Sequence, residues 1–132
     1  MYKVKRNHIV EELEIEDNGK TLKLAVDINV DTMLKAYNNA QYKIAQASID
    51  AKKAADKKNV EAAEVAMGNA VFALFDVVFG EEQRNKIIEF YDNKPLEMLG
   101  DIAPFIAEVV APRFKEAQQK IEESYRQVNR RK

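Results

Sequence analysis

The feature that most constrains the fold is one apolar run. Residues 69–91, NAVFALFDVVFGEEQRNKIIEFY, hold the densest series of large apolar side chains in the sequence. Apolar residues recur there at spacings of three and four, the period of an α-helix. The stripe consists of Met67, Ala70, Val71, Leu74, Phe75 and Val78, flanked by Phe72, Val77 and Phe79. A stripe this wide indicates burial on more than one side, so the run predicts the central helix of a small helical domain.

The run also contains two residues that break its apolar character. Gly80 can take the left-handed conformation that ends a helix, and Glu81 suits the positive end of the next one. We therefore predict one helix ending at Gly80 and another over residues 81–92. A carboxylate at Asp76 would cost several kcal/mol if buried alone. We expect it to face solvent, with an ion pair to a lysine or arginine as the alternative.

Residues 9–28 have a period of two instead. Apolar residues alternate with charged ones on both sides of Asn18-Gly19, a pair that tolerates the positive φ angles of a tight hairpin turn. The apolar positions are Leu13, Ile15, Leu22, Leu24, Val26 and Ile28, and the polar face carries Glu12, Glu14, Glu16, Lys20 and Lys23. This pattern predicts a β-hairpin. Because two strands alone are marginal in water, its apolar face should cover a helix or join another chain's sheet.

Between the hairpin and the apolar run, residues 31–79 follow the helical period and are rich in alanine. Two arrangements are open. A turn at residues 57–59 would make an antiparallel helix pair, with Asp31 and Asn59 as N-caps. Ala62, Ala63 and Ala66 would then face Ala47, Ala51 and Ala55. A single unbroken helix would be roughly 70 Å long, and ordinary helix lengths favour the pair.

The C-terminal third contains the three prolines. Pro95 marks a helix start, whereas Pro104 and Pro112 are expected to break or kink the helix that follows. Beyond them a narrow apolar stripe continues at helical spacing through Phe114, Ile121, Tyr125 and Val128. Residues 113–132 carry seven basic and three acidic side chains, a net charge of +4. The stripe suits a coiled-coil seam or a docking helix, and a frayed, soluble terminal helix is the alternative.

Together these patterns predict a mainly α protein with an N-terminal β-hairpin (α+β), a small bundle of about four to five helices kinked or broken near Pro104 and Pro112. At 132 residues we expect a single domain: residues 1–30 form the hairpin, 31–112 the helical core and 113–132 an amphipathic C-terminal helix or tail. The chain has no cysteine, no apolar leader and no continuous apolar run of about 18 residues. We therefore expect a cytoplasmic protein that does not enter a membrane.

The residues of common active sites do not gather in the sequence. His8 is the only histidine, and nothing in the sequence places it beside a serine or an acid. The four glycines are far apart in the sequence, so it contains no glycine-rich motif for binding phosphate or a dinucleotide. We expect no catalytic residues, no cofactor and no metal, hence no enzyme.

A family resemblance lies in the block VFALFDVVFGEEQRNKIIEFYDNKPLEMLGDIAPFIAEVVAPRF. This block resembles the tail assembly chaperones of long-tailed, non-contractile phages and prophages of Gram-positive bacteria. In that family an apolar helix ends at a junction of the "FGEE" type, and a short helix similar to KIIEFYD and a closing helix follow. The resemblance covers about residues 22–114 and carries no catalytic residue.

The resemblance implies a non-enzymatic protein of the host bacterial cytoplasm. It would bind the tape measure protein, help to recruit tail tube subunits during tail assembly, and associate with itself as a homo-oligomer. Related genes often also yield a longer product by ribosomal frameshifting. As partner-contact residues we predict Phe72, Val77, Phe79, Phe114, Ile121, Tyr125 and Val128.

The alternative is a small helical adaptor or regulatory module. Its basic C-terminal helix would bind a protein or nucleic acid. The formal net charge of the whole chain is -1, whereas general nucleic-acid binders are more often basic, so nucleic acid is the less favoured partner.

Overall fold

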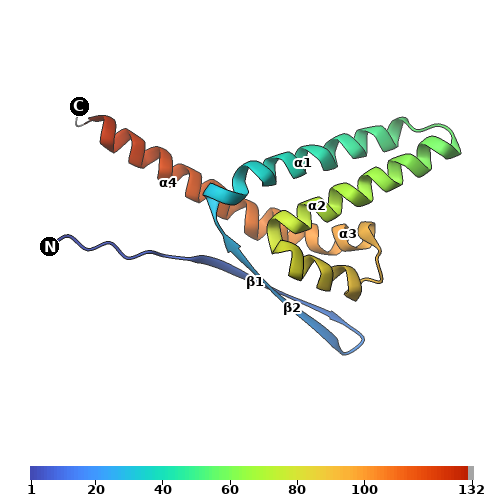
Figure 1. The fold of residues 1–132 in the computed structure, drawn as a ribbon, viewed down its shortest axis with the longest axis horizontal. Helices are drawn as coiled ribbons and strands as arrows, with labels where there is room; N and C mark the ends of the chain where they lie inside the picture. Colours follow the sequence, from blue (N-terminus) through green and yellow to red (C-terminus); the bar gives the residue numbers. More distant parts are fainter. Residues whose placement is uncertain (131–132) are drawn as a thin grey trace.

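A computed structural model describes residues 1–130 of the chain. In order, the elements are β1 (Ile9–Asp17), β2 (Lys20–Ile28), α1 (Val30–Lys53), α2 (Lys57–Phe90), α3 (Pro95–Phe105), the π-helical η1 (Ile106–Val110) and α4 (Ala111–Arg130). Figure 1 shows the hairpin crossing one side of the helices, α1 and α2 side by side, and α4 leaving the body toward the end where the chain begins. The fold is mainly helical with an N-terminal antiparallel hairpin, as predicted.

The hairpin has the predicted turn and register. Asn18 (φ 49°) and Gly19 (φ 82°) both have positive φ, as a two-residue type I′ turn requires. Leu13 stands opposite Leu24, and Glu14 opposite Lys23. Leu24, Val26 and Ile28 of β2 are buried, so the apolar face covers helices of its own chain.

The number of helices is smaller than predicted. Residues 30–130 form three helices, because α3, η1 and α4 join into one without an interruption. The prediction of four to five helices, broken near Pro104 and Pro112, is therefore wrong. Pro104 lies inside α3, and Pro112 follows a wide turn in which the Ala111 N–H donates to the Ile106 carbonyl, five residues back. The π-helical turn changes the hydrogen-bond pattern immediately before Pro112, so the helix continues past a residue that lacks an N–H.

The break predicted at Gly80 is a kink inside α2. Gly80 has φ 83° and ψ 163°, which are not helical, and α2 changes direction there (Figure 1). The last part of α2, residues 81–90, thereby turns toward the hairpin.

The helix pair is confirmed and the single long helix is excluded. α1 ends at Lys53 and α2 begins at Lys57, a few residues before the predicted turn. The caps differ from the prediction. Asn29, not Asp31, accepts the Thr32 N–H at 3.3 Å, and Asp56, not Asn59, caps α2 by accepting the Asn59 N–H at 2.8 Å.

The alanine contact between α1 and α2 is narrower than predicted. Ala47 and Ala63 are buried, whereas the other four alanines expected at the contact, Ala51, Ala55, Ala62 and Ala66, are exposed. The buried alanines Ala40, Ala47, Ala63 and Ala70 are seven residues apart along each helix. Only one line of residues on each helix therefore faces the other.

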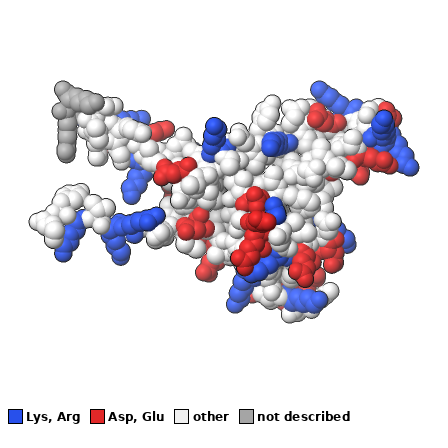
Figure 2. Space-filling model, viewed as in Figure 1, with Lys and Arg blue, Asp and Glu red and all other residues white. Residues whose placement is uncertain are grey.

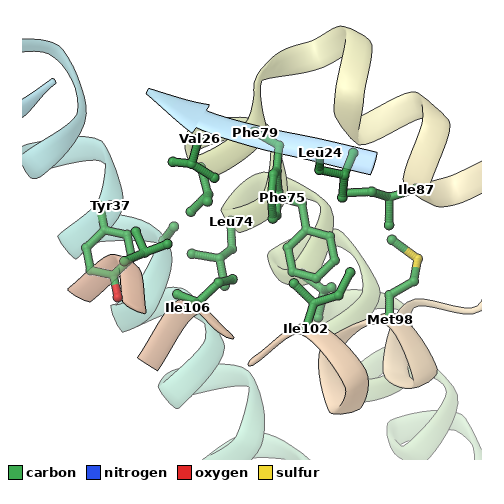
Figure 3. Packing of buried hydrophobic residues seen from close by; sticks show 14 of the residues in the cluster. Leu24, Val26, Tyr37, Leu74, Phe75, Phe79, Ile87, Met98, Ile102 and Ile106 are labelled. Atoms are coloured by element: carbon green, nitrogen blue, oxygen red, sulfur yellow. The ribbon is translucent and has the colours of Figure 1, made fainter. Parts of the chain in front are cut away.

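The core surrounds α2 on three sides. Val71, Leu74, Phe75 and Val78 are all buried, as predicted. Figure 3 shows Leu24 and Val26 of β2 on one side of this set, Met98, Ile102 and Ile106 on another, and Tyr37 of α1 on a third. This three-sided packing is why the apolar stripe of α2 is so wide.

Gln83 attaches the kinked part of α2 to the hairpin. Its side-chain oxygen accepts the Ala25 N–H at 2.8 Å, and its side-chain nitrogen donates to the Ala25 and Phe79 carbonyls, both at 2.7 Å. Asp76 faces solvent, as predicted, and it also forms the ion pair that was the alternative, with Arg84 at 3.3 Å. A further ion pair joins Glu11 of β1 to Arg113 of α4 at 2.7 Å.

Candidate partner-binding surface

The seven predicted contact residues divide into three groups. Phe79 and Phe114 are buried, Phe72 and Val77 are half-buried, and Ile121, Tyr125 and Val128 are exposed. Only the last three remain together on an accessible surface.

Phe79 and Phe114 are occupied by contacts within the chain. The Phe79 ring lies edge-on to Phe75, with centroids 5.8 Å apart, and stacks with Phe105 at 6.4 Å. Phe114 packs on Tyr37 at 4.8 Å and joins the start of α4 to α1. Neighbouring helices already cover both rings, so neither belongs to an accessible surface in this structure, and their role in partner contact stays a prediction.

The exposed group lies on what we call the α4 arm, residues 118–130. Every residue of the arm is exposed, and the arm extends away from the body (Figure 1). Ile121, Tyr125 and Val128 are separated by four and three residues, so they share one side of the helix. Their exposed fractions of 40%, 68% and 60% leave this apolar stripe uncovered in the chain by itself. Residues 131–132, the end of the predicted tail, lie outside the described residues.

A second apolar surface escaped the sequence prediction. Tyr42 of α1 lies at a shallow hollow of about 350 Å³ between α1 and α2. Four alanines line it, Ala47, Ala66, Ala70 and Ala73, together with four polar residues, Lys43, Gln46, Asp50 and Asn69. The alanine-rich composition was the available signal, but we interpreted it only as a contact between the two helices.

A second hollow, of about 230 Å³, is mainly acidic. It is lined by Tyr91 and by one basic residue, Lys94, together with Glu16, Asp17, Asp92, Glu97 and Asp101. The Tyr91 hydroxyl donates to Asp101 at 3.0 Å. Burial of the ring, followed by this hydrogen bond and the negative charge of Asp101, raises the pKa of Tyr91 well above its ordinary value. The phenol therefore keeps its proton and joins the end of α2 to α3.

Other chemical features are few. Within residues 1–130, no group of three or more histidine, cysteine, aspartate or glutamate side chains is arranged to hold a metal ion. His8 is exposed in the N-terminal segment. α2 is long and apolar enough to cross a membrane, a property that the core helix of a soluble protein shares. Here its stripe packs against β2, α1 and α3.

Comparison with known proteins found no match: no family model, no curated protein and no solved structure resembles the chain significantly.

Proposed function

We propose that the chain is a non-enzymatic tail assembly chaperone of a long-tailed phage or prophage. It would bind the helical tape measure protein and help to bring tail tube subunits to it in the host cytoplasm. The α4 arm is the observation that supports this proposal most directly. The sequence resemblance described above supplies the identity of the partner.

The α4 arm has the features of a helix that packs against another molecule. An isolated helix of about this length is only marginally stable in water, and most helices in proteins are stabilised by packing an apolar face. Residues 118–130 are all exposed, so the rest of the described chain supplies no such packing for the arm. Its stripe is also narrow, since polar residues surround Ile121, Tyr125 and Val128. A narrow stripe fits the side of another helix better than a flat surface.

A long helical protein has the matching chemistry. It would offer apolar side chains at the same three-and-four spacing over many turns, and it would aggregate if they stayed exposed. Packing against the α4 arm removes apolar area of both molecules from water. The buried ring of Phe114 packs on Tyr37 and holds the start of α4 on the body.

Co-expression tests the proposal. The partner is the longest helical protein encoded beside this gene, and its soluble yield should rise when the chain is present. A triple variant, Ile121→Ser, Tyr125→Ser and Val128→Ser, should lose the effect. The matched control is Gln119→Ser, Glu123→Ser and Arg126→Ser on the opposite side of the arm, which removes one charge of each sign.

The proposal fails if the soluble yield does not rise, or if the two triple variants behave alike. The salt dependence of binding distinguishes the chaperone from the alternative, an adaptor that binds nucleic acid. Residues 1–8 and the α4 arm project at the same end of the molecule (Figure 1), and they carry Lys3, Lys5 and Arg6 and Lys120, Arg126 and Arg130, respectively. Binding of nucleic acid by these residues would weaken steeply with added salt, whereas binding through an apolar stripe would not.

A further inference from the structure

The outer edge of β2 is occupied at Ala25, whereas the outer edge of β1 is free along its length. The Gln83 amide occupies both backbone groups of Ala25, so in β2 these groups point away from β1. In an antiparallel pair, the backbone N–H and C=O groups of two directly opposite residues point either both toward the partner strand or both away from it. Ala25 stands opposite Glu12. The N–H and C=O groups of every second residue of β1, namely Val10, Glu12, Glu14 and Glu16, therefore point outward. None of them takes part in a hydrogen bond among residues 1–130.

The segment before β1 has the opposite charge to β1 itself. Residues 1–8, here called the N-terminal arm, contain Lys3, Lys5 and Arg6 and no acidic residue. β1 carries Glu11, Glu12, Glu14, Glu16 and Asp17. The arm continues outward from β1, toward the end where α4 also projects, and is exposed along its length (Figure 1). Figure 2 shows basic side chains on this projecting segment and a mixture of acidic and basic ones over the hairpin.

We propose that the N-terminal arm and β1 pair antiparallel with the same segment of a second copy of this chain. Val10 would stand opposite Val10 of the second copy. Arg6 would then face Glu14, and Lys3 would face Asp17. A two-fold axis makes each of these contacts twice, and the two hairpins form one four-stranded sheet, a form of β-augmentation.

The charges select this register. A shift of two residues in one direction places Glu11 opposite Glu11 of the second copy, and like charges directly opposite are destabilising. A shift of two in the other direction leaves Tyr2 and Val4 opposite glutamates. A shift of one residue would place the outward backbone groups against inward ones. In the proposed register the aliphatic part of Lys5 can also cover the half-buried Ile15.

This inference is independent of the proposed function. It depends on the edge of β1, whereas binding of the tape measure protein is assigned to the α4 arm. A chain that pairs through β1 but binds no tape measure protein would contradict only the proposed function. The reverse result would contradict only the pairing.

Disulfide trapping tests the register directly, because the chain has no native cysteine. Opposite residues of a hydrogen-bonded antiparallel pair have Cα atoms about 5.5 Å apart, which a disulfide can span. Val10→Cys should therefore form a covalent dimer rapidly under mild oxidation. Lys23→Cys, exposed on the same face of the hairpin but on β2, is the matched control. Equal rates for the two variants would overturn the proposed register.

Sedimentation tests the pairing without oxidation. The unmodified chain should be a dimer that Glu14→Pro converts to a monomer, since this proline removes an outward N–H that the monomer does not use. Arg6→Glu should raise the dimer dissociation constant by about tenfold, and adding Glu14→Arg should restore it. Circular dichroism checks that each variant is folded. A monomeric unmodified chain, or a Glu14→Pro variant that remains a dimer, would disprove the inference.

Discussion

At the scale of single residues, Gly80 and Gln83 together connect the kink of α2 to the hairpin. The backbone of Gly80, at φ 83° and ψ 163°, lies in a region that only glycine readily occupies. The Phe79 carbonyl, directly before the kink, accepts a hydrogen bond from the Gln83 side chain. The same amide binds both backbone groups of Ala25. One side chain thus joins the kink of α2 to β2 at Ala25.

Substitution of Gly80 and of Gly100 by alanine should change the free energy of unfolding in opposite directions. Gly80→Ala should lower the free energy of unfolding by about 1–3 kcal/mol, because a side chain strains this backbone conformation. Gly100→Ala should raise it by about 0.5–1 kcal/mol, because Gly100 lies inside α3, where alanine is the better helix former. A Cβ atom would meet nothing within 4 Å at either site, so both effects come from the backbone. Urea unfolding measures them, and a shift of the same sign in both variants would contradict this account.

Substitution of Gln83 tests its three hydrogen bonds. Gln83→Ala should lower the free energy of unfolding by about 1–3 kcal/mol. Gln83→Glu should cost more at pH 7, because a carboxylate would face two carbonyl oxygens. Those oxygens favour the protonated form, so the deficit should shrink as pH falls through the carboxyl's titration range, near about pH 4–5. Glu82→Ala is the control, since its exposed contact with Lys86 at 3.7 Å contributes little. A deficit in Gln83→Glu that does not change with pH would argue against the carbonyl contacts.

At the scale of elements, local sequence patterns predicted the type of each element better than its boundaries. Asn18-Gly19 between alternating segments was sufficient to predict the hairpin, whereas the helix pair was favoured over a single long helix only by ordinary helix lengths. The caps were wrong because Asn29 and Asp31, like Asp56 and Asn59, are near one another and equally able to cap. Pro104 and Pro112 misled the helix count, because Pro104 lies inside α3 and Pro112 follows a π-helical turn that sequence periodicity does not show.

The contact between α2 and α3 should depend on pH through Tyr91. Burial and Asp101 raise the pKa of Tyr91 above the ordinary value of about 10. The hydroxyl's contribution to stability is therefore fully present below about pH 10 and is lost as pH rises further. Tyr91→Phe should be less stable at pH 8, and its difference from the unmodified chain should narrow between pH 10 and pH 11. Urea unfolding at these values measures it, and the other four tyrosines contribute equally to both proteins. A constant difference would contradict the assigned hydrogen bond.

At the scale of the whole molecule, the sequence separated core from solvent better than core from contact surface. Periodicity showed that the apolar stripe of α2 is wider than one face of a helix, because it includes Phe72, Val77 and Phe79. It did not show that β2, α1 and α3 would cover α2 from three sides. Phe114 was likewise assigned to the same stripe as Ile121, although Tyr37 of α1 covers only the first of them. Which apolar side chains stay exposed depends on where the neighbouring elements end, and short-range patterns do not contain that information.

Truncation should separate the body from the α4 arm. In a chain ending at Ala117 every described residue that is lost, 118–130, is exposed, so its thermal midpoint should stay within about 2 °C of the full chain. It should no longer raise the soluble yield of the tape measure protein. A chain ending at Pro112 also loses Phe114 and its contact with Tyr37, and removal of a buried phenylalanine ring costs about 3–5 kcal/mol. That variant should unfold at a much lower temperature. If the chain ending at Ala117 were equally destabilised, the arm would be part of the monomer's own core rather than a surface kept for another molecule.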